Sequence, residues 1–280
     1  MIFVSKYSPF DIEGMEGKYM NLKRIVYVCI TILLVGIVIN IAFNVRGFYQ
    51  VDAAKVTTIT EQFDHVEVTS DNASISVLPS SSSDASVEYT SKQNRKNLSV
   101  KVKDNTLLVE LKQKWWNNFR FVINTSSNKL IIYLPEKEYE EIMVSTSNGS
   151  VEGNEIKANQ LIFESDNGSV ELEDIIGKDV YAETNNGKVF MKNVEGKIEA
   201  DSDNGSITLE TKTLDQYISL STDNGSIEVN SDQEPTNATI TASNDFGGIN
   251  IYGSSDKTIT YGKGKYQIEL DTDLGSISVK

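Results

Sequence analysis

An internal repeat of about 19 residues is the feature that most constrains how this chain can fold. Asn-Gly recurs with successive spacings of 19, 19, 18 and 20 residues. The five pairs are Asn148-Gly149, Asn167-Gly168, Asn186-Gly187, Asn204-Gly205 and Asn224-Gly225. A Ser or Thr stands two positions before each Asn, and a Val or Ile stands three positions after it. Self-similarity at a fixed period is typical of repeat architectures, so the repeat decides the fold class.

Each repeat predicts two short strands around a sharp turn. In the second repeat, Leu161 and Phe163 alternate with other residues before the turn, and Val170 and Leu172 do the same after it. Alternation with period two indicates strands that bury one face. Asn and Gly both tolerate positive φ, so we expect the pair where the chain reverses direction.

Two all-β architectures fit this pattern. An antiparallel meander would use each Asn-Gly as a hairpin turn. A β-solenoid would use it as a corner and would stack equivalent residues of successive coils about 4.8 Å apart. The recurring hydroxyl residue and the near-constant spacing favour the solenoid, because stacked hydroxyls can satisfy one another at a narrow corner.

Diverged copies of the repeat extend the prediction in both directions. Residues 245–249 and 273–277 resemble the Asn-Gly corners, with an insertion between them, and residues 70–75 carry Ala in place of Gly. Terminal repeats are expected to be atypical, since they cap the core and protect exposed edges. We therefore predict one continuous β-solenoid domain over residues 55–280.

An uncharged run precedes this domain. Residues 25–43 contain no charge, and their length is close to the roughly 20 residues that a helix needs to cross a bilayer. Basic residues gather before the run, which predicts a cytoplasmic segment 1–24, a single transmembrane helix and a linker 44–54. We expect the helix to stay uncleaved as an anchor. A start of translation at Met20 is left open, in which case residues 1–19 would not be translated.

The composition excludes several classes of function. The chain has one His, one Cys and a net charge of −14, which argues against an internal disulfide, a zinc site or a nucleic-acid partner. We predict no cofactor. The acidic turn 201–205 begins like a calcium loop but has Gly at the fifth position rather than the sixth. Stacking could align Asp166, Asp203 and Asp223, and we interpret that row as a solvated face rather than a metal site.

A basic and aromatic stretch stands apart from the repeat. Residues 92–129 carry nine basic and two acidic side chains and both tryptophans. The candidate contact residues are Lys112, Lys114, Trp115, Trp116, Phe119 and Arg120. Tryptophan beside Lys and Arg suits an anionic lipid surface or a wall polymer. The other interpretation is a loop that caps the end of the solenoid, and the two roles are compatible.

The stretch Leu130–Pro135, followed by Tyr139–Val144 and by Ser145–Gly149, resembles the bacterial "putative adhesin" or toastrack-like family, a domain of unknown function. The resemblance covers about residues 60–280. It implies an extracytoplasmic β-solenoid, often anchored by one helix and found in cell-envelope stress modules. It implies no catalytic residues.

We therefore expect a non-enzymatic binding or structural module of a bacterial cell envelope, anchored in the cell membrane with its C-terminal domain outside. Its partners would be the membrane and a wall polymer, an anionic lipid or a membrane protein. Two alternatives stay open: a glycan-active enzyme that uses a pair of carboxylates on a β-helix, and a sensor subunit that acts through a membrane partner.

Overall fold

The computed structural model describes residues 55–91, 98–112 and 128–280. These residues form a 20-stranded sheet without any helix. The described part accordingly contains no helix that is long and apolar enough to cross a membrane. The predicted anchor 25–43, its flanking segments 1–24 and 44–54, and the start at Met20 fall outside these ranges, so they stay predictions.

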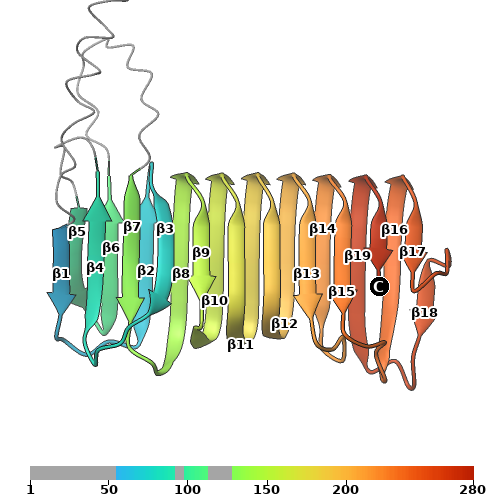
Figure 1. Cartoon of the computed structure of the whole chain (residues 1–280), viewed down its shortest axis with the longest axis horizontal. Helices are drawn as coiled ribbons and strands as arrows, with labels where there is room; N and C mark the ends of the chain where they lie inside the picture. The colour runs from blue at the N-terminus through green and yellow to red at the C-terminus, as the bar shows by residue number, and fades with distance from the viewer. Residues whose placement is uncertain (1–54, 92–97, 113–127) are drawn as a thin grey trace, which may run out of the picture. The chain divides into compact units, whose positions relative to one another are not determined.

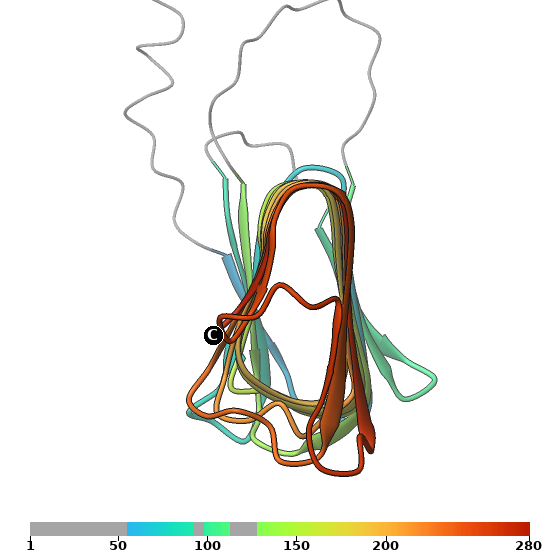
Figure 2. The same cartoon turned by 90° about the vertical axis from the view of Figure 1, so that its right-hand side faces the viewer.

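The sheet winds into a solenoid whose coils each have two long sides (Figure 1). Seen from the end, the coils superimpose on a narrow loop that is tightly rounded at its upper edge (Figure 2). We call the two sides wall A and wall B. The rounded edge, where the chain passes from wall A to wall B, is the corner edge.

Wall A contains eleven strands or strand halves. In spatial order they are β5 (Leu98–Lys103), β6 (Thr106–Leu111), β2 (His65–Ser70), β8 (Glu138–Asn148), β10 (Lys157–Asn167), the second half of β11 (Val170–Asn186), the second half of β12 (Val189–Asn204), β14 (Ile218–Asn224), β19 (Tyr266–Leu274), β16 (Ala238–Phe246) and β18 (Thr258–Thr260).

Wall B is built in the same way. Its strands are β1 (Lys55–Ile59), β4 (Ala85–Thr90), β7 (Lys129–Leu134), β3 (Ser74–Pro79), β9 (Val151–Asn154), the first halves of β11 and β12, β13 (Ile207–Thr211), β15 (Ile227–Ser231), β20 (Ile277–Val279) and β17 (Ile249–Ile251).

Parallel pairing between coils confirms the predicted solenoid and excludes the meander. Leu161 of β10 pairs with Ile142 of β8 on one side and with Val180 of β11 on the other, both in parallel register. Wall B pairs in parallel too, as Val170 does with Val151 and Val189. Equivalent residues of successive repeats therefore stack on one another, as the 19-residue spacing requires.

The core lies between the two walls and follows the predicted alternation. Leu161 and Phe163 of wall A and Val170 and Leu172 of wall B are each 0% exposed. Their neighbours along each strand point outward, so both walls present a mostly polar outer surface. The same inward pattern runs through every coil, and one continuous apolar core results.

Both ends of the stack depart from the order of the chain. The coil β19–β20, at the end of the sequence, lies between the coils β14–β15 and β16–β17. At the other end, the coil β2–β3 lies inside β6 and β7, which follow it in the chain. Antiparallel strands then flank the outer coils, and the edge strand β5 carries Lys101 and Lys103, a composition that discourages further strand pairing.

Candidate functional site

The predicted Asn-Gly turns all lie on the corner edge, where successive corners approach one another very closely. A Cβ atom placed on Gly187 would lie 2.1 Å from the carbonyl oxygen of Gly168, and one on Gly205 would lie 1.5 Å from that of Gly187. These distances are shorter than any van der Waals contact. Glycine is required there because backbone packs directly on backbone.

This finding corrects the reason expected from the sequence. None of the corner Asn residues is among the described residues with positive φ, and Gly168, Gly187 and Gly205 are not among them either. Close approach selects Gly at these corners, and at Gly149 a positive φ of 141° adds to it. Ala73 stands at the equivalent position of the coil β2–β3, and its carbonyl oxygen would lie 2.3 Å from a Cβ placed on Gly149.

The hydroxyl residue of each repeat binds the neighbouring corner. Thr184 is 0% exposed, and its Oγ1 donates a hydrogen bond of 2.7 Å to the carbonyl oxygen of Gly168. The other members of this row donate to the equivalent carbonyl in the same way. They are Thr146 to Ala73, Ser165 to Gly149, Ser202 to Gly187, Thr222 to Gly205 and Thr272 to Gly225. The hydroxyls therefore satisfy backbone acceptors rather than one another.

The Asn side chains form a second ladder outside the first. The side-chain amide of Asn186 donates to the Oδ1 of Asn167 at 3.2 Å, and that of Asn204 donates to the Oδ1 of Asn186 at 3.3 Å. Asn224 continues the ladder by donating to Asn204 at 3.2 Å. The corner Asn residues thus have a structural role, because each one ties its coil to the next.

The predicted contact stretch is mostly beyond what the structure describes. Lys114, Trp115, Trp116, Phe119 and Arg120 fall in the undescribed range 113–127. Lys112 is described: it follows β6, is exposed, and lies 3.2 Å from the carboxylate of Glu110. The choice between a capping role and a contact role therefore stays open at this point.

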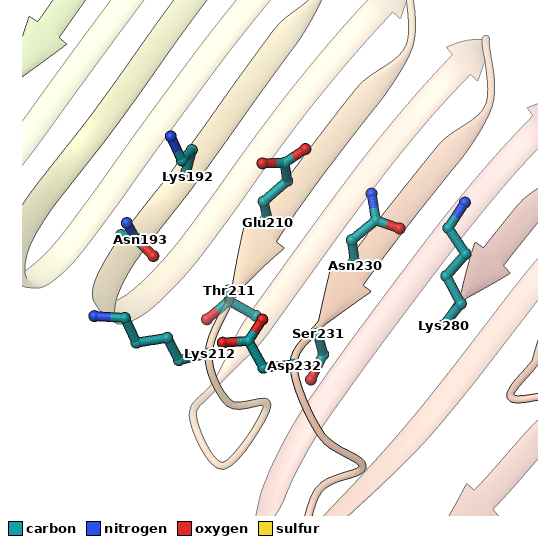
Figure 3. Close-up of a pocket in the computed structure, with 9 residues that line it drawn as sticks. All are labelled: Lys192, Asn193, Glu210, Thr211, Lys212, Asn230, Ser231, Asp232 and Lys280. Atoms are coloured by element: carbon teal, nitrogen blue, oxygen red, sulfur yellow. The ribbon is translucent and has the colours of Figure 1, made fainter.

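A polar pocket that the sequence did not predict lies on the outer face of wall B, near the edge opposite the corners (Figure 3). Its volume is about 440 Å³. The lining residues are Lys192, Asn193, Glu210, Thr211, Lys212, Asn230, Ser231, Asp232 and Lys280. It forms where β13 and β15 end and their chains turn into loops, whereas β11 and β12 run on from wall B to wall A.

Two of the three lysines of this pocket are held by carboxylates. Lys192 lies 2.5 Å from Glu173, which raises the pKa of that lysine, and Lys280 lies 2.6 Å from Glu228. Within the described chain no ion pair holds Lys212, which is exposed at the rim. The pocket therefore offers the unpaired cation of Lys212 together with the carboxylates of Glu210 and Asp232, amides and hydroxyls, a set that suits a hydroxyl-rich ligand.

Wall A carries a row of carboxylates on successive coils. Glu164, Glu183 and Asp201 are in register, and the phenol of Tyr181 donates to Glu183 at 2.5 Å. Partial burial raises the pKa of Glu164 and of Asp201, and neighbouring carboxylates add to both shifts. Across the described ranges, no group of three or more His, Cys, Asp or Glu residues is arranged to hold a metal ion.

Comparisons with known proteins identify similar solved structures and a matching family. Similar solved structures include a "putative cell adhesion protein" from Clostridium sporogenes (16% identity, TM-score 0.40, covering 81% of this chain and 99% of that one) and a "putative adhesin" from Bacteroides fragilis (15%, 0.39, 82% and 98%). A third is a "putative adhesin" from Parabacteroides distasonis (12%, 0.37, 81% and 97%). No curated protein matches the chain. The sequence profile of the Toastrack DUF4097 family matches residues 63–280, and the chain therefore belongs to that family.

Proposed function

We propose that this protein is a non-enzymatic binding module of a bacterial cell envelope, in which the solenoid is a rigid scaffold displayed outside the cytoplasmic membrane. The observation that carries the proposal is the regularity of the two walls. Successive coils place equivalent side chains at intervals of about 4.8 Å, and hydrogen bonds between the corners hold those intervals. A periodic, stiff and polar surface is suited to a polymeric ligand that is itself periodic.

The side chains of the pocket on wall B suit a ligand from the cell wall, namely a polymer that is rich in hydroxyl groups. The pocket around Glu210 and Asn230 combines hydrogen-bond donors with acceptors, and positive with negative side chains. It is open to solvent on the outer face. Residues 145–280 together carry ten basic and 24 acidic residues, which disfavours a strongly anionic polymer along this part of the domain.

The proposal that the solenoid lies outside the membrane is supported by the uncharged run 25–43 and by the basic residues before it. Protease added to intact cells without their outer wall should remove an epitope tag placed after Lys280. Resistance of the tag until the membrane is dissolved would refute this orientation.

Binding is tested with the purified full-length protein and isolated wall sacculi. Lys212→Ala should weaken binding about tenfold, since a hydrogen bond from a charged donor contributes about 1.5 kcal/mol or more. Lys178→Ala is the matched control, because Lys178 is also exposed but lies outside the pocket. Equal binding by the two variants would exclude the pocket, and absence of binding by the unmodified protein would exclude the proposed ligand.

A further inference from the structure

Two large apolar side chains interrupt the Asn ladder at the C-terminal end of the stack. Leu274 and Phe246 occupy the ladder position in the last two coils, next to Asn224. They are 51% and 70% exposed, although Asn fills this position in the five preceding coils. Neither side chain contributes to the core, so packing within the domain does not explain them. Adjacent exposed apolar residues are typical of contact surfaces.

Each residue of this apolar pair directly follows an aspartate in the chain. Asp223, Asp273 and Asp245 precede the ladder residues of the last three coils, and all three are exposed. None of them takes part in an ion pair within the described chain. We call these three aspartates, together with Leu274 and Phe246, the end patch. An acidic surface with an apolar centre fits a partner that is aromatic and basic.

The chain contains a sequence with these properties, and the described residues that flank it lie at the opposite end of the same edge. Residues 113–127 contain both tryptophans, two phenylalanines, Lys114 and Arg120, and they contain no acidic residue. The described residues on either side of this stretch, at positions 111 and 128, lie at the corner edge. The carbonyl oxygen of Leu111 accepts a hydrogen bond from Asp71, and the side-chain amide of Asn128 donates one to the carbonyl of Asn72.

The stretch cannot reach the end patch of its own chain. Seven strand spacings of about 4.8 Å separate β6 from β19, which makes about 34 Å. A stretch of 15 residues that is fixed at both ends extends at most about 27 Å from its anchor points. An occupant from this sequence must therefore come from a second copy. A copy that continues the stack would place its residues 113–127 on the same edge as the end patch.

We propose that the protein associates head to tail, with the end patch of one copy receiving residues 113–127 of the next. Such a contact is heterologous, because each copy contributes a different surface, and it forms open chains or closed rings rather than only dimers. The contact combines burial of Phe246 and Leu274 with pairing of opposite charges. It gives the tryptophan stretch a binding role in addition to any capping role.

The test measures the mass of the purified full-length protein in detergent by sedimentation, over a concentration series. The unmodified protein should form species larger than a dimer, and 0.5 M salt should weaken them because the charge contribution is screened. Phe246→Asn with Leu274→Asn should abolish assembly and should leave the melting temperature unchanged or raised, since Asn is the residue of this position in the other coils. Ile176→Asn is the control, because Ile176 is exposed to a similar extent (44%) outside the end patch, and it should assemble normally.

Mixing two variants gives the decisive result. Trp115→Ala with Trp116→Ala should also prevent assembly, but an equimolar mixture with the Phe246→Asn, Leu274→Asn variant should form a heterodimer, because one intact patch and one intact stretch remain. A synthetic peptide of residues 112–129 provides a second measurement that does not depend on folding of the tryptophan variant. It should bind the unmodified protein and bind the Asn variant at least tenfold more weakly.

Four outcomes would overturn the proposal. The first is an unmodified protein that is monomeric at every concentration, and the second is a mixture of the two variants that stays monomeric while the peptide binds both proteins equally. The third is assembly that survives the two Asn substitutions. The fourth is an end patch whose substitution abolishes only the flotation of the protein with lipid vesicles and leaves its assembly unchanged.

Discussion

The corner hydroxyls should be essential to the stability of the stack, and Thr184→Val tests this directly. Valine keeps the shape of threonine but removes the donor to the carbonyl oxygen of Gly168, which lies 2.7 Å from Oγ1 at a site with 0% exposure. The loss of a buried hydrogen bond whose acceptor stays in place costs about 1 to 3 kcal/mol. No cavity forms, so this cost is not increased by a packing defect.

The expected effect is measurable by thermal unfolding. For a domain of this size, about 2 kcal/mol corresponds to a decrease in melting temperature of about 4 to 8 °C. We would follow the circular dichroism of the full-length protein in detergent. Thr208→Val is the matched control, because Thr208 lies in a neighbouring coil on the outer face of wall B and makes none of the corner hydrogen bonds. Its melting temperature should change by only a degree or two.

Hydrogen exchange adds a local measurement. Amides of the corners next to Thr184 should exchange faster in the Val variant, whereas those of the terminal coils should not, because each coil contacts only its neighbours. Equal melting temperatures for Thr184→Val and Thr208→Val would refute the reasoning, since the corner hydroxyl would then contribute no more than a surface threonine.

Two further predictions follow from the described contacts. Gly205→Ala places a methyl group 1.5 Å from the carbonyl oxygen of Gly187 and should prevent normal folding, whereas Gly248→Ala meets nothing within 4 Å and should leave the melting temperature unchanged. Burial, with Glu199 and other carboxylates nearby, raises the pKa of Asp201, so the folded state binds the proton more tightly and stability falls as the pH rises through that raised pKa. Asp201→Asn should therefore raise the melting temperature at pH 7 by a few degrees at most, with no gain at pH 3, and a loss at pH 7 would contradict this sign.

Much of the fold could be predicted because one face of every strand is apolar and the corner residues recur at a nearly fixed interval. The parallel stacking of the Asn-Gly corners follows from that spacing, and the structure confirms it. The wall B pocket could not be predicted in this way. It depends on where β13 and β15 end and on side chains as far apart in sequence as Lys192 and Lys280, so no local pattern indicates it.

The exchanged order of the last coils shows where local pattern stops being informative. Residues 238–251 and 266–279 both have the inward alternation of a coil, and either could stack on β14–β15. Thr272 supplies the hydroxyl that binds the carbonyl of Gly225, whereas Asn244 stands at the equivalent position and its side-chain nitrogen is buried without a partner. The coil with the hydroxyl therefore continues the stack, and the coil without it forms the end.

The sequence by itself determined the all-β class, the solenoid with its period, and the corner positions, because each of these depends on residues that are close together in the chain. Only the tertiary structure decided the order of the terminal coils and the reason for each corner glycine. It alone also placed Leu274 beside Phe246 at the C-terminal end of the corner edge. These features depend on contacts between coils, where the identity of the neighbour, rather than local propensity, sets the free energy.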